Sequence, residues 1–242
     1  MIRLPFDKER VPVAILAAGD YPSGRIASSI LTTAEKVVCC DGAAAGYIDR
    51  GGRPYAIVGD CDSIPAEVRE RYSDAVRCVP DQETNDLTKA VGFCVDAGYG
   101  DITIVGATGK REDHTVANIS LLAEYAMTPG VKSVRLVTDR AVFDAIVPGV
   151  PGGYADFIGQ YDERGLFPEL EPEEFVFESY AGQQVSIFTP VPGVRITTGR
   201  LAYPLHNVRL RGWWSGTLNE SESDAFSIVA TGPAIICRVF EA

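Results

Sequence analysis

The chain has 242 residues, of which 46% are hydrophobic and 23% charged, a composition typical of a globular protein with one or two domains. Its 33 acidic residues outnumber its 22 basic residues, and the net charge of -11 disfavours binding to the phosphate backbone of nucleic acid. The apolar run over 11–18 is too short to span a bilayer, so we expect no membrane segment and no export signal.

The six cysteines are scattered along the chain and form no C-x-x-C pair. No histidine lies near enough in the sequence to complete a zinc site with them. We therefore expect a reducing environment and a cytoplasmic location.

Short β-branched runs alternate with segments of helical periodicity over the first 140 residues. The predicted strands are 13–16, 36–40, 55–58, 75–79, 102–105 and 134–137. The predicted helices lie around 26–34, 42–50, 65–72, 84–97 and 113–126. Continuous apolar runs of this kind are typical of strands buried on both faces, so the alternation predicts a parallel sheet of βα units.

The amino-acid composition of the sequence changes after this region. Proline and glycine are dense over 148–153, and 163–174 is acidic with several prolines, so we interpret 148–180 as a linker or insertion. Further predicted strands follow at 184–188, 194–197, 225–229 and 234–239. The fold class is therefore α/β, with a parallel-sheet βα domain over 1–147 and a small all-β sandwich domain over 181–242. The latter is short enough to need a partner surface.

Polar residues follow the predicted strands, where an open parallel sheet binds its ligands. These polar segments are Asp41-Gly42, 59–63, 81–86 and 106–114. Carboxylates that converge on one edge of a sheet repel one another unless a cation screens them. Hard oxygen ligands suit Mg²⁺, which is the ion that this pattern predicts.

Two acidic pairs each have two interpretations. Asp60 and Asp62 point the same way if their segment is extended, toward a shared ion, but an Asx turn has equal weight on spacing alone. Asp86 and Lys89 lie three apart at the start of a helix, where both can face the strand ends. An ordinary surface ion pair explains the second spacing equally well.

A cationic loop precedes the last predicted helix of the first domain. Gly109, Lys110 and Arg111 stand just before a helix that begins near Asp113, an arrangement typical of a phosphate cradle. Residues 19–25 have the glycine spacing of a Walker A loop but lack its Lys-Ser/Thr, so the chain is not a P-loop kinase.

The remaining candidates are aromatic or imidazole side chains. His114 either contacts phosphate or orients Asp113, and a capping or packing role is the alternative. Trp213 and Trp214 either stack on a flat cation or pack in a core or an interface.

Taken in order, three motifs resemble the N-terminal motifs of thiamine pyrophosphokinases. They are Gly-Asp-Cys-Asp-Ser over 59–63, Asp-Gln-Glu-Thr-Asn-Asp-Leu-Thr-Lys over 81–89, and Gly-Lys-Arg-Glu-Asp-His with its continuation to Ile119 over 109–119. Two later segments also resemble that family, namely 199–205 with its Tyr-x-Leu and 215–220 with its Asn-Glu. The similarity covers nearly the whole chain apart from about 148–180.

Members of that family transfer a pyrophosphoryl group from ATP to the hydroxyl of thiamine and release AMP, with Mg²⁺. They are homodimers with active sites at the subunit interface. The resemblance thus implies an ATP-binding catalytic domain over 1–147 and a thiamine-binding β-sandwich over 181–242. It implies ATP and thiamine as partners, and neither nucleic acid nor a membrane.

The resemblance also implies roles for individual residues. The expected metal ligands are Asp60, Asp62 and Asp86. The expected catalytic residues are Asp62, Asp86, Gln82 and Asp113. Binding of ATP and its phosphates is expected from Lys89, Arg111, Gly109 and Asp41, and binding of thiamine from Thr217 and Asn219, facing the partner subunit. Asn85, where the family usually has Thr, and Thr217, in place of a frequent Ser, depart from the pattern but keep their hydrogen-bonding capacity.

Two functions of other classes remain as alternatives. A metal-dependent phosphohydrolase would use the Asp60-x-Asp62 pair as nucleophile and acid, but the second acidic pair that this chemistry needs is missing near residues 136–140. A non-catalytic module that binds thiamine or a nucleotide would be expected to have lost part of its acidic set, which here is intact.

Overall fold

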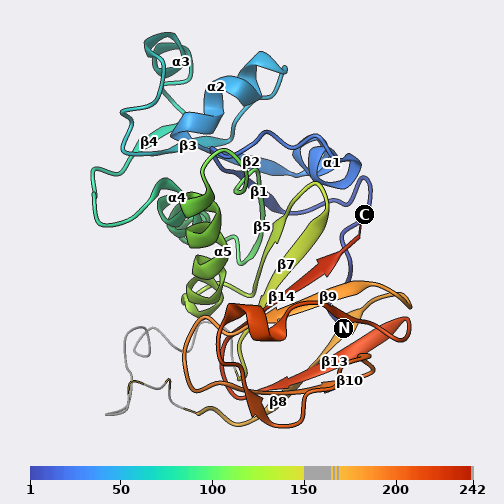
Figure 1. Ribbon diagram of the computed structural model, residues 1–242. Helices are drawn as coiled ribbons and strands as arrows, with labels where there is room; N and C mark the ends of the chain where they lie inside the picture. The colour runs from blue at the N-terminus through green and yellow to red at the C-terminus, as the bar shows by residue number, and fades with distance from the viewer. Residues whose placement is uncertain (150–164, 166, 168, 241–242) are drawn as a thin grey trace. The chain divides into compact units, whose positions relative to one another are not determined.

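The computed structural model of the chain describes residues 1–149, 165, 167 and 169–240 (Figure 1). Its internal contacts divide it into two compact units. The α/β unit comprises Phe6–Ile119 and Leu136–Asp139, and the β unit comprises Met1–Pro5, Ser120–Arg135 and Arg140–Ala242. The domain limits that we expected, 1–147 and 181–242, rest on the change in amino-acid composition along the sequence and stay a prediction.

The α/β unit alternates strands and helices as the sequence predicts. Its elements are β1 (Val13–Leu16), α1 (Arg25–Thr33), β2 (Lys36–Cys40), α2 (Asp41–Asp49), β3 (Ala56–Gly59), α3 (Ala66–Arg71), β4 (Val76–Cys78), α4 (Asp86–Asp96) and β5 (Asp101–Val105). Helix α5 (Glu112–Met127) begins in this unit, and strand β6 (Ser133–Val137) contributes its last residues to it. Each predicted strand and helix of this region is confirmed within a few residues.

The sheet of the α/β unit is parallel, with strand order β5-β1-β2-β3-β4. All four residues of β1 are buried, as expected of a strand covered on both faces. The chain moves outward from β1 to β4 and then returns to β5 on the other side of β1. This reversal of order opens a crevice at the carboxyl ends of β1 and β5, where parallel sheets bind ligands.

One pair of cysteines corrects the expectation of a fully reduced chain. Cys61 and Cys78 form a disulfide, while the other four cysteines are free and buried. The two residues lie 17 positions apart, and the sequence gives no sign that they meet. They meet because β3 and β4 are neighbours in the sheet, with Gly59 opposite Cys78.

The β unit consists of two antiparallel sets of strands. Its elements are β7 (Ala141–Ile146), β8 (Glu173–Glu178), β9 (Gln184–Phe188), β10 (Arg195–Gly199), β11 (Val208–Arg209), the 3-10 helix η2 (Trp213–Gly216), β12 (Asn219–Glu220), β13 (Ala225–Ala230) and β14 (Ala234–Val239). One set runs β12-β9-β14-β7 and the other runs β11-β10-β13-β8.

The four strands that we predicted in this region are β9, β10, β13 and β14, and all four are confirmed. Strand β8 lies inside the stretch that we interpreted as a linker or insertion, so residues 173–178 are a paired strand of the sandwich instead. Residues 150–164, 166 and 168 of that stretch lie outside the described part of the chain.

The core of the β unit lies between its two sets of strands. Phe177 of β8 and Phe226 of β13 stack with their ring centroids 5.1 Å apart. They belong to one buried cluster with Ile187 of β9 and Ile236 of β14. The two sets therefore form a β-sandwich, as predicted.

A buried ion pair ties the first residues of the chain to this sandwich. The side chain of Arg238 is fully buried, and its Nη2 lies 2.6 Å from Oδ2 of Asp144. The same guanidinium donates hydrogen bonds to the backbone carbonyls of Ile2, Arg3 and Glu178. Burial raises the pKa of Asp144, and the neighbouring Arg238 opposes that shift.

We predict that Asp144→Asn destabilises the protein by about 3–5 kcal/mol, because it leaves the Arg238 charge buried without its partner. Urea unfolding of wild type and variant measures the loss. Glu174→Gln, an exposed acid on β8, is the control and should change little. The double variant Asp144→Leu/Arg238→Met should recover part of the loss, and equal stability of Asp144→Asn and wild type would contradict the prediction.

Candidate functional site

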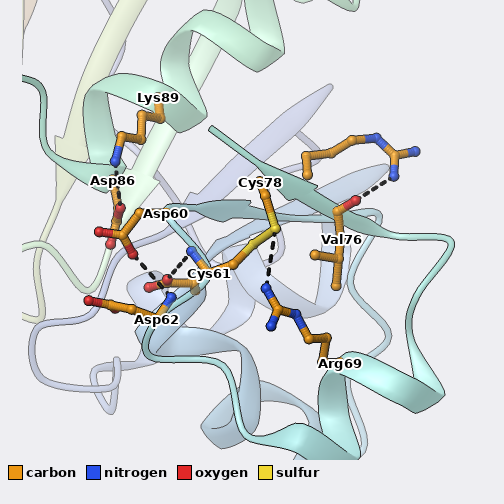
Figure 2. The surroundings of a disulfide bond; sticks show 10 residues. Asp60, Cys61, Asp62, Arg69, Val76, Cys78, Asp86 and Lys89 are labelled. Atoms are coloured by element: carbon orange, nitrogen blue, oxygen red, sulfur yellow. Dashed lines mark hydrogen bonds and ion pairs between the residues drawn. A yellow bond between two sulfur atoms is a disulfide. The ribbon is translucent and has the colours of Figure 1, made fainter. Parts of the chain in front are cut away.

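Three carboxylates converge at the carboxyl ends of neighbouring strands. One oxygen each of Asp41, Asp60 and Asp86 lies within 4.8 Å of the others. Asp41 opens α2 directly after β2, Asp60 follows β3, and Asp86 opens α4, as Figure 2 shows for the latter two. We call these three residues the acidic cluster.

Local backbone features fix the positions of these side chains. Gly59 has no side chain, and a Cβ at its position would stand 2.6 Å from Cγ of Asp41, so Asp41 can pack against the end of β3. The side chain of Asn85 accepts a hydrogen bond from the backbone N–H of Thr88 (2.9 Å) and so fixes the start of α4 at Asp86. Asn85 thus keeps the capping capacity expected at this position.

The acidic cluster carries unfavourable charge. Burial, together with the nearby Asp86, raises the pKa of Asp41 to about 6. The backbone N–H of Asp62 lowers the pKa of Asp60. Lys89 supplies positive charge beside the cluster, with its Nζ 3.6 Å from Oδ1 of Asp86. Three carboxylates facing one ammonium form a hard-oxygen donor set that fits a divalent ion such as Mg²⁺.

The ion pair of Asp86 and Lys89 is not the ordinary surface pair that was the alternative interpretation of their spacing. The Lys89 side chain is almost entirely buried, so its charge is directed to the strand ends. Gln82 also reaches the cluster, with its Nε2 3.5 Å from Oδ2 of Asp60. The structure therefore brings Gln82, Asp86 and Lys89 together, as expected.

Asp62 departs from the expectation that it shares an ion with Asp60. It lies outside the acidic cluster, its backbone N–H donates to Oδ1 of Asp60 (3.2 Å), and its carboxylate accepts from Ser63. The reason is the backbone of Cys61, whose φ of 71° is left-handed and breaks the extended alternation that would align the two carboxylates. The Asx turn, the alternative interpretation, is what forms.

A pocket of about 270 Å³ lies beside the cluster in the α/β unit. Its lining combines residues after β1, after β5 and at the start of α4, namely Ala17, Ala18, Gly19, Cys40, Asn85, Asp86, Leu87, Ala107, Gly109, Lys110, Arg111, His114 and Asn118. It therefore occupies the crevice between β1 and β5 where the strand order reverses.

The glycine of the cationic loop is required at its position. Gly109 has a φ of +78°, and a Cβ there would stand 2.1 Å from Oδ2 of Asp20. Lys110 folds back, and its Nζ donates to the backbone carbonyl of Ala18 (2.9 Å). The loop thus contacts the segment after β1 and forms one wall of the pocket.

Arg111 and Asp113 form an ion pair. The guanidinium donates to both carboxylate oxygens, at 3.1 and 2.5 Å, and its hydrogen bonds lower the pKa of Asp113 to about 2. The backbone N–H of His114 donates to the same carboxylate. Arg111 and His114 line the pocket, so Asp113 orients a cation at its rim.

In the β unit, Thr217 and Asn219, which we expected to bind thiamine, form side-chain hydrogen bonds with the backbone of nearby turns. Oγ1 of Thr217 donates to the carbonyl of Trp214 (2.7 Å). Asn219 is buried and exchanges two hydrogen bonds with the backbone of Tyr203. Trp213 packs on Phe188, with ring centroids 5.5 Å apart, whereas Trp214 is 73% exposed.

Two further residues, one of the pocket lining and one beside the cationic loop, had no role of their own in the sequence analysis. Asn118, nearly two turns into α5, lines the pocket, donates from Nδ2 to the carbonyl of Ala107 (2.8 Å) and also contacts the side chain of Asn85. Asp20 contacts the cationic loop through its backbone N–H, which donates to the carbonyl of Thr108. Asn118 lies within the 109–119 motif, which could have signalled it, whereas the place of Asp20 depends on contacts between segments distant in sequence.

Comparison with known proteins agrees with these features. Residues 27–134 match the catalytic domain of thiamin pyrophosphokinase, and residues 165–237 match its substrate-binding domain. The chain belongs to the thiamin pyrophosphokinase family. The two matched ranges contain both the acidic cluster and the turns around Thr217 and Asn219.

Individual relatives match over shorter stretches. The chain is 36% identical over 101 residues to thiamine pyrophosphokinase 1 of rice (Oryza sativa subsp. japonica), which covers 38% of this chain and 37% of the relative. It is 30% identical over 109 residues to the thiamine pyrophosphokinase of Bacillus subtilis (strain 168), covering 42% of this chain and 49% of the relative. The matched part thus spans less than half the length of these two relatives.

Solved structures share the fold over nearly the whole chain. The thiamine pyrophosphokinase of Bacillus subtilis superposes with a TM-score of 0.66 at 21% identity, covering 97% of this chain and 100% of that one. The thiamin pyrophosphokinase of Candida albicans gives 0.65 at 17% identity, covering 94% and 90%. Among the described residues of the present chain, no helix is long and apolar enough to cross a membrane.

The raised pKa of Asp41 predicts how metal-free stability depends on pH. The folded protein holds a proton on Asp41 that the unfolded chain releases near its ordinary pKa, so the free energy of unfolding falls as pH rises from about 4 to 6. Asp41→Asn removes this penalty, and we expect it to raise the Tm of the metal-free protein at pH 7.5 by several degrees, because each kcal/mol raises the Tm by about 2–4 °C in a chain of this size.

Thermal melts of metal-free protein between pH 4 and 8 test this prediction. Asp49→Asn, an exposed acid on the same helix, should keep the wild-type dependence on pH. With Mg²⁺ added at pH 7.5, the wild type should have a higher Tm than Asp41→Asn, because only the wild type keeps all three carboxylates. An unchanged pH dependence in Asp41→Asn would show that another group titrates.

Proposed function

We propose that the chain transfers the pyrophosphoryl group of ATP to the hydroxyl of thiamine, giving thiamine diphosphate and AMP. The observation that carries this proposal is the acidic cluster beside a pocket whose lining includes Asp86, Lys110 and Arg111. A polyphosphate bound there would meet both metal-binding carboxylates and cations. Membership of the thiamin pyrophosphokinase family supports the choice of substrates.

Pyrophosphoryl transfer needs little covalent catalysis from the protein, which mainly positions the reactants and neutralises charge. We propose that Asp41, Asp60 and Asp86 hold Mg²⁺, which when bound neutralises charge on the phosphate oxygens. Lys89 orients Asp86 through its ion pair and adds positive charge at the strand ends. Arg111, held at the rim by Asp113, binds a phosphate with a bidentate donor pair, while Gly109 lets the loop approach.

The other predicted site residues fit subsidiary roles in this proposal. Gln82 donates to Asp60 and so orients a metal ligand. Asp62 lies beside the cluster with an exposed carboxylate, which is available to the acceptor hydroxyl or to a second ion. Thr217 and Asn219 shape the turns that we propose bind thiamine. We also keep the cytoplasm as the proposed location.

The alternatives have less support. A phosphohydrolase that uses Asp60 and Asp62 together requires both carboxylates to face one substrate atom, whereas Oδ1 of Asp60 accepts the backbone N–H of Asp62 in an Asx turn. A binding module without catalysis has no need of a buried lysine aimed at an acidic cluster. Neither alternative is favoured by a specific contact among the described residues.

An assay with ATP, Mg²⁺ and thiamine, following AMP and thiamine diphosphate together, tests the proposal. Asp86→Asn should lower turnover by about 100-fold or more, because it removes charge from the metal site. Asp96→Asn, an exposed acid at the other end of α4, is the matched control and should retain activity. Phosphate release from ATP without thiamine would support the hydrolase instead, and no turnover would support the binding module.

We further propose that the active form is a homodimer whose β unit contributes to the contact. Among the exposed large apolar side chains of that unit, three belong to turns joined by hydrogen bonds, namely Tyr203 (67%), Trp214 (73%) and Leu218 (82%). Apolar side chains gathered near one another in this way are typical of an interface.

Sedimentation at micromolar concentration should give twice the chain mass. Leu218→Asp should shift the protein toward monomer, because a charge would be buried in the contact. Phe6→Glu, an exposed apolar residue of the α/β unit, is the control and should leave the dimer intact. A wild-type monomer at these concentrations would contradict the proposal.

A further inference from the structure

The disulfide of Cys61 and Cys78 adjoins the proposed metal site, because the backbone of Cys61 contacts the acidic cluster. Cys61 stands between Asp60 and Asp62, and Cys78 is the last residue of β4, as Figure 2 shows. The bond therefore connects the loop that carries a member of the acidic cluster to the edge strand of the sheet.

The conformation of this loop depends on Cys61. Its φ of 71° is left-handed, a region that residues other than glycine seldom adopt. In that conformation its backbone N–H donates to Oδ2 of Asp41 (3.1 Å), and the next N–H donates to Oδ1 of Asp60 (3.2 Å). Holding Cys61 in place thus holds two carboxylates of the acidic cluster.

The strand at the other end of the bond has few other restraints. β4 has three residues, and among the described strands it pairs with β3 alone. The chain runs from β4 through residues 79–85 to Asp86, the third member of the cluster. Because the disulfide links both approaches to the cluster, its loss would loosen Asp60 and the segment that leads to Asp86.

The bond is also accessible to a reductant. Of the six cysteines, all of them within the described residues, only Cys78 has an exposed side chain. Nη2 of Arg69 lies 3.6 Å from Sγ of Cys78, and a guanidinium there stabilises the Cys78 thiolate that the second exchange releases. In a reducing compartment, a disulfide in such a place is more often a redox sensor than a permanent structural bond.

We propose that the Cys61–Cys78 disulfide is a redox site, and that its reduction by a dithiol weakens Mg²⁺ binding at the acidic cluster. A thiolate of the dithiol attacks Sγ of Cys78, the S–S bond breaks, and Cys61 leaves as a thiolate that takes up a proton. The second thiol of the reductant then displaces Cys78, which takes up the second proton. Two electrons reach the protein, and the reductant leaves as a disulfide.

This inference rests on the proposed function for the identity of the ion, but its test does not depend on turnover. Metal-free protein is compared oxidised and after anaerobic treatment with excess dithiothreitol, with alkylation and mass spectrometry to count the newly reactive thiols. Calorimetric titration gives Mg²⁺ affinity, and hydrogen exchange gives protection of the amides of Cys61 and Asp62.

We expect reduction to weaken Mg²⁺ binding by about tenfold and to speed exchange of these two amides by a similar factor, the scale of one left-handed residue losing its restraint. The matched control is Cys61→Ser/Cys78→Ser, which should behave like the reduced protein and not respond to dithiothreitol. In Cys61→Gly/Cys78→Ser, glycine adopts the left-handed backbone freely, so part of the lost affinity should return.

Equal Mg²⁺ affinity and equal exchange in oxidised and reduced wild type would overturn the inference and leave a purely structural crosslink. This comparison needs no variant, so a folding failure of a serine variant does not affect it. If the affinities differ while neither form makes AMP and thiamine diphosphate, the redox coupling holds and the proposed function fails.

Discussion

Mutual repulsion among three carboxylates is the constraint on which the α/β unit depends. Asp41, Asp60 and Asp86 are held together although burial and neighbouring charge raise the pKa of Asp41 to about 6. A fold selected for stability alone would place these charges apart. The surrounding structure therefore has to oppose the repulsion, and it does so with one buried lysine, a capped helix start and a crosslinked loop.

The sheet makes this arrangement possible. Parallel strands end at a common edge, and helices α2 and α4 begin with Asp41 and Asp86 at that edge. Helix α4 packs against β1, β2 and β3, so the core positions the helix that carries Asp86, and the Asn85 cap fixes where that helix begins. Carboxylates at helix starts also gain from the helix dipole. The scaffold thus contributes part of what holds the charges until a cation binds.

The β unit solves a different electrostatic problem. Its buried charge, Arg238, is paired with Asp144, and both Nη atoms donate to backbone carbonyls, including those of Ile2 and Arg3, while the buried Nε has no partner among the described residues. The charge is therefore a structural tie that needs no added ion. The two units therefore use charge differently. The paired charge of Arg238 stabilises the β unit, whereas the acidic cluster next to its pocket is available to a ligand.

The sequence by itself determined the order of strands and helices in the first 140 residues, because each apolar run and each amphipathic helix is a local pattern. It also placed Asp60, Asp86 and Gly109 at strand ends and helix starts. Only the tertiary structure decided which carboxylates come together, and Asp62 lies outside the cluster because the left-handed backbone of Cys61 interrupts the extended alternation. The pairing of Cys61 with Cys78 and the strand β8 likewise depended on which strands become neighbours, and that is set by packing between segments distant in sequence.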